Sequence, residues 1–144
     1  MKIAVGNDHA GTTLKLAVCD LLERLGHTVV NVGTNTDESV DYPDFAHQVA
    51  ELVVNQTVDR GVVICGSGNG VNITVNKYAE IRSALCWTKE IATLARQHND
   101  ANVIAIPARF VSEELALEMV TAFFETSFEG GRHSKRVEKI AAKK

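Results

Sequence analysis

Residues 61–70 read GVVICGSGNG, a short apolar run followed directly by three glycines at alternate positions. A run without polar or charged side chains is typical of a strand that is covered on both faces, as in a parallel sheet. The glycines predict a tight turn into a helix that begins within or just after residues 68–70. A strand, a tight turn and a helix in this order form the repeating unit of α/β folds.

The same alternation continues in both directions along the chain. Apolar, largely β-branched runs predict four more strands, at residues 2–5, 28–32, 82–86 and 102–106. Apolar residues at helical spacing predict helices over 14–22, from Pro43 to residue 53, over 89–96, after an N-capping Ser112, and from about residue 133. We therefore expect residues 1–144 to form one domain, a doubly wound, Rossmann-like αβα sandwich with a five-stranded parallel sheet.

The composition excludes several classes of protein. The 144 residues include 15 Lys and Arg and 18 Asp and Glu, for a net charge of −3, and 45% are hydrophobic. These values exclude a disordered chain and a nucleic-acid-binding surface that spans the whole chain. No apolar run approaches the roughly 20 residues of a membrane helix. We expect no signal peptide, because a strand-like segment starts at residue 2. Three cysteines without a CxxC pair predict neither a disulfide framework nor a zinc site. We expect a cytoplasmic protein without a metal or cofactor.

Ligands of open parallel sheets bind beyond the carboxyl ends of the strands, so the residues that follow each strand are candidates for the site. The loop CGSGNG at 65–70 is the strongest of them, because its backbone N–H groups can cradle an anion near a helix N-terminus. Its GxGxG spacing matches neither the dinucleotide fingerprint nor the phosphate loop of nucleotide-binding proteins. A tight turn without a ligand is the alternative interpretation.

Cys65 ends the third strand beside this loop, where a helix N-terminus can lower the pKa of a thiol. A buried structural cysteine remains the alternative. Asp8 and His9 follow the first strand, and His98 lies in a polar run that is otherwise expected to be solvated. Arg132 and Arg136 are four residues apart, which on a helix places both on one face and suits a phosphate. The alternative for this pair is a solvated basic surface.

Four motifs occur together in this order: GNDHAG (6–11), CGSGNG (65–70), RQHNDAN (96–102) and FEGGRHSKRV (128–137). Together they resemble the ribose-5-phosphate isomerase B family and its galactose-6-phosphate isomerase relatives, from Lys2 to about Ile140. The resemblance implies an aldose–ketose isomerase of the pentose phosphate pathway that needs no metal or cofactor. It also implies a homodimer or homotetramer in which each site uses residues of two subunits.

Carried over by position, the resemblance implies that Cys65 abstracts the proton and that His98 assists ring opening, with Ser67 and Asp8 as further catalytic residues. The implied substrate contacts are Asp8, His9, Gly66, Ser67, Gly68, Asn69, Gly70, Asn99, Arg109, Arg132 and Arg136. Some members use a glutamate after the glycine loop instead of the cysteine. Here Val71 occupies that position, which implies the cysteine-type mechanism. Asn7 stands where a small residue such as serine is expected, which leaves the fine shape of the sugar pocket open.

The residue types fit a proton transfer between C2 and C1 through a cis-enediolate. The Cys65 thiolate takes and returns the proton, the loop N–H groups stabilise the enediolate, and Ser67 relays the hydroxyl proton. An isomerase for allose 6-phosphate or galactose 6-phosphate is the alternative substrate assignment. A nucleotide- or flavin-binding module without catalytic activity is the more distant alternative.

Overall fold

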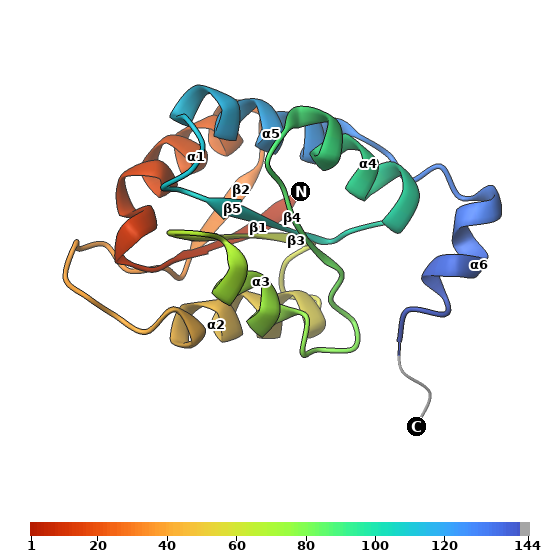
Figure 1. Ribbon diagram of the computed structural model, residues 1–144, viewed down its shortest axis with the longest axis horizontal. Coiled ribbons are helices and arrows are strands. Elements are labelled where there is room, and N and C mark those ends of the chain that lie inside the picture. The colour runs from red at the N-terminus through yellow and green to blue at the C-terminus, as the bar shows by residue number, and fades with distance from the viewer. Residues whose placement is uncertain (142–144) are drawn as a thin grey trace.

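Five parallel strands form one sheet in the order β2-β1-β3-β5-β4 (Figure 1). The computed structural model describes residues 1–141. The strands are β1 (Lys2–Asn7), β2 (Thr28–Asn31), β3 (Arg60–Cys65), β4 (Ser83–Leu85) and β5 (Val103–Pro107). The predicted five-stranded parallel sheet is therefore confirmed. Its order differs from the 2-1-3-4-5 order of flavodoxin-like folds, because β5 lies between β3 and β4.

Helices cover both faces of the sheet, as Figure 1 shows. On one face lie α1 (Thr12–Arg24), α4 (Lys89–Asn99) and α5 (Glu113–Glu125), and on the other lie α2 (Tyr42–Val54) and α3 (Asn69–Val75). The apolar side chains of β3 contribute to the hydrophobic cores on both faces of the sheet. Val62 and Ile64 pack on the α1, α4 and α5 side, whereas Val63 and Cys65 pack on the α2 and α3 side. This is why the central strand has no polar face.

Local signals in the sequence set several element ends. The Ser112 hydroxyl accepts a hydrogen bond from the Leu115 N–H at 3.1 Å, so Ser112 is the predicted N-cap of α5. The Asp8 carboxylate caps the short 3-10 turn η1 (His9–Gly11) by accepting from the Ala10 N–H at 2.9 Å. Among the described residues, no helix combines the length and the apolar character that crossing a bilayer demands.

The C-terminal segment is less helical than the sequence predicts. It comprises the 3-10 turn η2 (Gly131–His133) and one turn of α-helix, α6 (Ser134–Val137). Residues 142–144 of the predicted helix lie outside the described residues. Short helices depend on tertiary packing, and α6 has no buried residue, while Ile140 beyond it is 54% exposed. The segment therefore stops being helical after one turn.

Candidate active site

The first group of expected site residues meets at the carboxyl edge of the sheet. The Asp8 N–H donates to the Ile64 carbonyl at 3.1 Å, which places Asp8 and His9 beside the end of β3. His9 is oriented by the loop after β2, because its Nδ1 accepts from the Val40 N–H at 3.2 Å. The Arg109 N–H donates to the Gly66 carbonyl at 3.0 Å, which fixes the end of β5 against the glycine loop.

The glycine loop is shaped by close contacts that a side chain would block. A Cβ on Gly66 would lie 3.2 Å from Arg109 Cδ, so the Arg109 side chain passes directly over the loop. A Cβ on Gly70 would lie 2.5 Å from the Tyr42 ring. Gly68 has a φ of 73° at the N-cap of α3, a left-handed conformation that favours glycine. The absence of side chains at these glycines therefore lets Arg109, Leu85 and Tyr42 pack closely against the loop.

Cys65 is placed by β3 at the base of this loop. Its side chain is 4% exposed, and its carbonyl accepts from the Ala108 N–H at 2.9 Å. The other two thiols are in less favourable surroundings for chemistry. Burial raises the pKa of Cys86 to about 12, and burial is also the main reason that the pKa of Cys19 is raised. Of the three thiols, Cys65 alone lies at the glycine loop.

The second group of expected residues lies at the opposite, amino edge of the sheet. His98 and Asn99 are the last residues of α4, and β5 begins four residues after Asn99. Arg82 fixes this helix end, because its Nε donates to the carbonyls of Asn99 and Asp100 at 3.1 Å each. The Asp100 carboxylate is shared between Arg96 at 2.8 Å and Arg82 at 3.3 Å. These contacts hold Asp100 at a φ of 46°, where the chain leaves the helix.

His98 belongs to a cluster that the sequence did not predict. Its ring stacks on His133 with centroids 4.2 Å apart and an interplanar angle of 12°. Glu129 Oε2 lies 3.5 Å from His133 Nε2 and 4.0 Å from His98 Nε2. The EGGRH sequence places Glu129 and His133 four residues apart, which is the one signal that links them. Their approach to His98 depends on the tertiary fold.

This cluster is also the one group of three metal-type ligands within the described residues, with ligand atoms within 4.8 Å of one another. Its electrostatic surroundings oppose a cation. Burial, His98, Arg132 and Arg136 all lower the pKa of His133, and Glu129 alone raises it. Because the neighbouring arginines disfavour positive charge here, we assign no metal to these residues.

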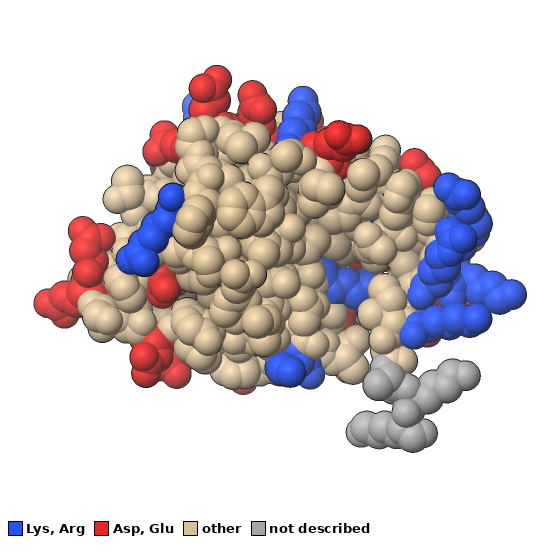
Figure 2. Space-filling view, in the orientation of Figure 1, with Lys and Arg blue, Asp and Glu red and all other residues tan. Residues whose placement is uncertain are grey.

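The two C-terminal arginines do not share one continuous α-helix, contrary to the expectation from their spacing. Arg132 lies in η2 and Arg136 in α6. The glycines before Arg132 have φ values of 65° and 55°, so the chain turns sharply at this point. Figure 2 shows Lys and Arg side chains gathered at the end of the molecule that carries α6. The basic character that the sequence predicts is therefore present, and the 3-10 turn that carries Arg132 runs directly into α6, which carries Arg136.

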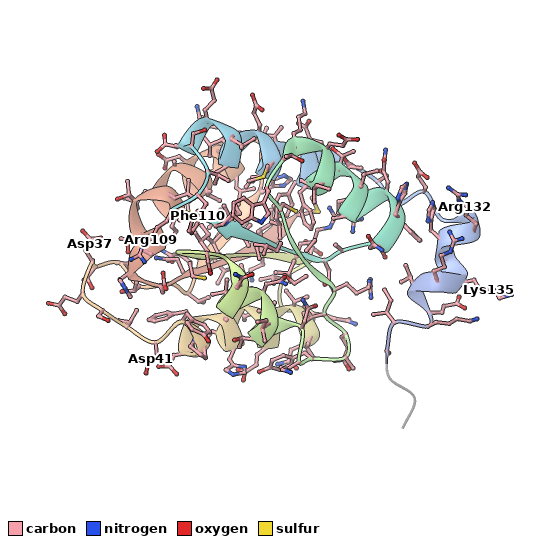
Figure 3. All side chains as sticks on the ribbon, viewed as in Figure 1. Asp37, Asp41, Arg109, Phe110, Arg132 and Lys135 are labelled. Carbon is pink, nitrogen blue, oxygen red and sulfur yellow. The ribbon has the colours of Figure 1, made fainter. Side chains whose placement is uncertain are left out.

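Within one subunit, the two groups of site residues lie at opposite edges of the sheet. Cys65 pairs with Pro107 at the carboxyl edge and Gly61 pairs with Val103 at the amino edge. Four residue steps separate these pairs, roughly 13 Å at about 3.3 Å per residue. Figure 3 shows Arg109 at one end of the molecule and Arg132 at the other. A residue at the end of a helix that follows a parallel strand returns to the amino edge, so the sequence held this information.

Asn7 stands where a small residue such as serine is expected, and the glycine at position 33 makes room for its larger side chain. Its side chain is fully buried, and its Nδ2 donates to the Asp8 carbonyl at 2.8 Å. A Cβ on Gly33 would lie 1.9 Å from Asn7 Oδ1. Within residues 1–141, this oxygen has no hydrogen-bond partner. The larger side chain is therefore accommodated by the absence of one at residue 33.

Comparisons with known proteins agree on one family. Residues 3–140 match the family model described as Ribose/Galactose Isomerase. The chain is 46% identical over 141 residues to ribose-5-phosphate isomerase B of Escherichia coli K12, covering 98% of this chain and 95% of that protein. A Clostridium thermocellum ribose-5-phosphate isomerase B structure matches with a TM-score of 0.95 and 47% identity, covering 97% of this chain and 95% of that one. A Mycoplasma genitalium ribose-5-phosphate isomerase B with bound ribulose-5-phosphate matches with a TM-score of 0.92 and 41% identity, covering 96% and 93%.

Proposed function

Because the chain belongs to the ribose/galactose isomerase family, we propose that it interconverts ribose 5-phosphate and ribulose 5-phosphate. The observation that carries this function is the match, over nearly the whole chain, to isomerases named for this reaction. The matching structure that holds ribulose 5-phosphate supports a phosphorylated sugar as the substrate. The enzyme is thus an intramolecular oxidoreductase, and we infer that residues 1–144 form its single domain in the cytoplasm.

Cys65 is the proposed base for the proton transfer. As a thiolate it takes the proton from C2, a cis-enediolate forms, and Cys65 returns the proton to C1. The position of Cys65 at the base of the glycine loop supports this role, and backbone N–H groups of this loop are proposed to stabilise the developing oxyanion. Ser67 relays the proton between the two sugar oxygens, and Asp8 and His9 hold the sugar.

Ring opening and most of the phosphate binding are assigned to the second group of residues, which includes His98 and Asn99 at the amino edge. His98 is the proposed acid–base group that opens the furanose ring, because imidazole exchanges protons readily near neutral pH. Asn99 contacts the sugar. Arg132 and Arg136 bind the phosphate together with Arg109, and this remote binding energy positions the reacting carbons.

A second copy of the chain is proposed to complete each site. The observation behind this proposal is the separation of Cys65 from His98 across the length of β3, which one small sugar phosphate does not span. The two ends of the chain also differ in charge. Figures 2 and 3 show basic side chains near Arg132 and Lys135, and acidic ones at the end that carries Asp37 and Asp41. An isologous dimer brings each basic end to an acidic end of its partner, and a tetramer of two such dimers keeps the arrangement.

Exposed aromatic side chains support an interface at the same place. Trp87 is 44% exposed and Phe110 is 63% exposed, and their ring centroids are 5.7 Å apart. Each follows a strand, so both lie at the carboxyl edge that the second copy is proposed to cover. Aromatic residues are enriched in the cores of protein interfaces.

Steady-state rates on ribose 5-phosphate, allose 6-phosphate and galactose 6-phosphate test the assignment. We expect the highest kcat/KM with ribose 5-phosphate, and a higher value with either six-carbon sugar would reverse the substrate assignment. Dialysis against a chelator is expected to leave the rate unchanged, because the mechanism uses only protein groups. Full loss of activity that a divalent ion restores would contradict the proposed chemistry.

A further inference from the structure

The Glu129 carboxylate is the acidic group of the cluster that contains His98. Its Oε2 lies 4.0 Å from His98 Nε2 and 3.5 Å from His133 Nε2, so it is at ion-pair distance from both imidazoles when they are protonated. Every other charged neighbour that acts on His133, namely His98, Arg132 and Arg136, disfavours positive charge there. Glu129 therefore opposes, at His133, the effect of the positive charges on Arg132 and Arg136.

The position of Glu129 is fixed by its main chain. Its N–H donates to the Gln97 carbonyl at 3.1 Å, directly before His98 in α4. Three residues earlier, the Thr126 carbonyl accepts from Arg96 Nε at 3.3 Å. The segment that carries Glu129 is thus tied to the last turn of α4 at two points. Neither bond uses the carboxylate, so the segment retains its place when the side chain is changed.

His133 limits the orientations that His98 can adopt. The His133 side chain is 8% exposed and lies nearly parallel to His98, whose side chain is 37% exposed. One ring face of His98 is therefore covered, and its Nε2 end faces Glu129. The rest of the ring is open to a ligand. A group that transfers protons has to be held in a productive orientation, and these two contacts provide that restraint.

We propose that Glu129 is a positioning residue for ring opening. Its negative charge, 4.0 Å from His98 Nε2, favours the orientation and the tautomer of the neutral imidazole in which the hydrogen is on Nε2, which leaves Nδ1 as the base. This inference rests on the ring-opening role proposed above for His98. Nδ1 takes the hydrogen of the anomeric hydroxyl, the bond between C1 and the ring oxygen breaks, and C1 becomes a carbonyl. The same proton is then passed to the former ring oxygen, which becomes the C4 hydroxyl.

The two directions of the reaction separate this role from a structural one. Ribulose 5-phosphate has no ring to open, because the phosphate occupies the only hydroxyl that could close a five-membered ring on C2. We expect Glu129→Gln to lower kcat with ribose 5-phosphate by about 10- to 100-fold, the lower part of the usual range for acid–base catalysis. With ribulose 5-phosphate, the expected fall in kcat is at most about threefold.

Two further variants sharpen the comparison. Glu129→Asp keeps the charge and should restore part of the rate with ribose 5-phosphate. Glu125→Gln removes an exposed carboxylate at the end of α5 and should leave both directions unchanged. Equal losses of kcat in the two directions would assign Glu129 a structural role and overturn the proposal, as would an unchanged rate with ribose 5-phosphate.

A measurement without turnover tests the electrostatic contact itself. Because Glu129 raises the pKa of His133 against the effects of burial and of the arginines, Glu129→Gln should lower that pKa further. An NMR titration of His133 in the wild type and the variant measures the change, and an identical pKa in the two would contradict the contact. If the wild-type enzyme isomerises neither pentose phosphate, the proposed function fails instead, and this titration still reports on Glu129.

Discussion

Cys65 ends β3 and Cys86 follows β4, and the different surroundings of the two thiols separate their roles. Cys65 lies at the glycine loop under Arg109, whereas Cys86 is fully buried and donates to the Ala84 carbonyl at 3.5 Å. Cys65→Ala removes the proposed base, so we expect kcat to fall by roughly 10²–10⁴-fold in both directions. Circular dichroism should show an unchanged fold. Cys86→Ala is the matched control and should stay active, and a Cys65→Ala enzyme with near wild-type turnover would disprove the assignment.

The phosphate contact at Arg132 gives a second prediction for a single residue. Arg132→Ala deletes charge-assisted hydrogen bonds of about 1.5–3 kcal/mol each. At about 1.4 kcal/mol per tenfold, kcat/KM for ribose 5-phosphate should fall about 10- to 100-fold. Arg132→Lys should retain only part of the wild-type kcat/KM, because lysine keeps the positive charge but lacks the planar guanidinium group that binds a phosphate with two hydrogen bonds.

Two controls accompany the Arg132 variants. Lys135→Ala, one residue into α6, should leave kcat/KM nearly unchanged although it removes a neighbouring positive charge. The slow rate with unphosphorylated ribose should not respond to Arg132→Ala. An equal loss of rate on ribose and on ribose 5-phosphate would show that Arg132 acts on the structure and not on the phosphate.

The sequence predicts single site residues better than it predicts their neighbours. Cys65 and the glycine loop follow from local chemistry, because both lie at the end of one recognisable strand. The contact of Glu129 with His98 joins residues 31 positions apart, and no local pattern encodes it. The spacing of Arg132 and Arg136 predicts a shared helical face, and in the structure the two residues lie in consecutive helical elements, because Gly130 and Gly131 turn the chain into a 3-10 turn before α6 begins.

Among the elements, the end of β4 carries a prediction about pH, because Cys86 directly follows this strand. Burial raises the pKa of Cys86 to about 12 from the ordinary value of 9.0, so the folded state keeps a proton that the unfolded state loses. The stability that this proton contributes is complete below pH 9 and declines between pH 9 and 12. At pH 10 the loss is about 1.4 kcal/mol for one group.

Urea unfolding at pH 8 and at pH 10 measures this loss. The free energy of unfolding of the wild type should fall by about 1.4 kcal/mol more than that of Cys86→Ala, which lacks the titrating group. Other groups that titrate in this range cancel in the difference. If both proteins lose the same free energy, the Cys86 thiol has no raised pKa in the folded state.

Strands and helices with a clear hydrophobic periodicity could be predicted from the sequence. The order in which the strands pair in the sheet could not. The order of strands and helices along the chain follows from apolar runs and amphipathic spacing. The placement of β5 between β3 and β4 does not, because pairing depends on which helices cover each face. The last predicted helix begins close to the expected residue, at Ser134. Within the described residues it forms only the one turn of α6, which buries none of its side chains.

For the whole molecule, the separation of the two groups predicts complementation between inactive variants. Cys65→Ala inactivates the half of the active site at the carboxyl edge, and His98→Asn inactivates the half at the amino edge. A mixed dimer then contains one site without any substitution and one with both. Random assembly of equal amounts makes about half of the dimers mixed, so a co-expressed pair should regain about a quarter of the wild-type activity.

The control is a pair of variants from the same half. In His98→Asn with Arg132→Ala, every site of every dimer carries a substitution, so activity should not exceed that of the separate variants. A site contained within one chain predicts no recovery for either pair. Activity of purified co-expressed dimers distinguishes these outcomes, and the absence of recovery in the first pair would rule out the shared site.

Asn7 and Gly33 also constrain how the sequence can have evolved. With Asn7 in place, any side chain at residue 33 collides with its Oδ1, since even a Cβ would come within 1.9 Å. The main-chain nitrogen of residue 7 would also lie 2.7 Å from that Cβ, so a smaller side chain at position 7 would not by itself make room at residue 33. Gly33 is therefore required by the backbone of β1 as well as by the Asn7 side chain. A substitution at residue 33 has no simple second-site suppressor at residue 7, and we expect this position to stay closed to variation whichever residue stands at position 7.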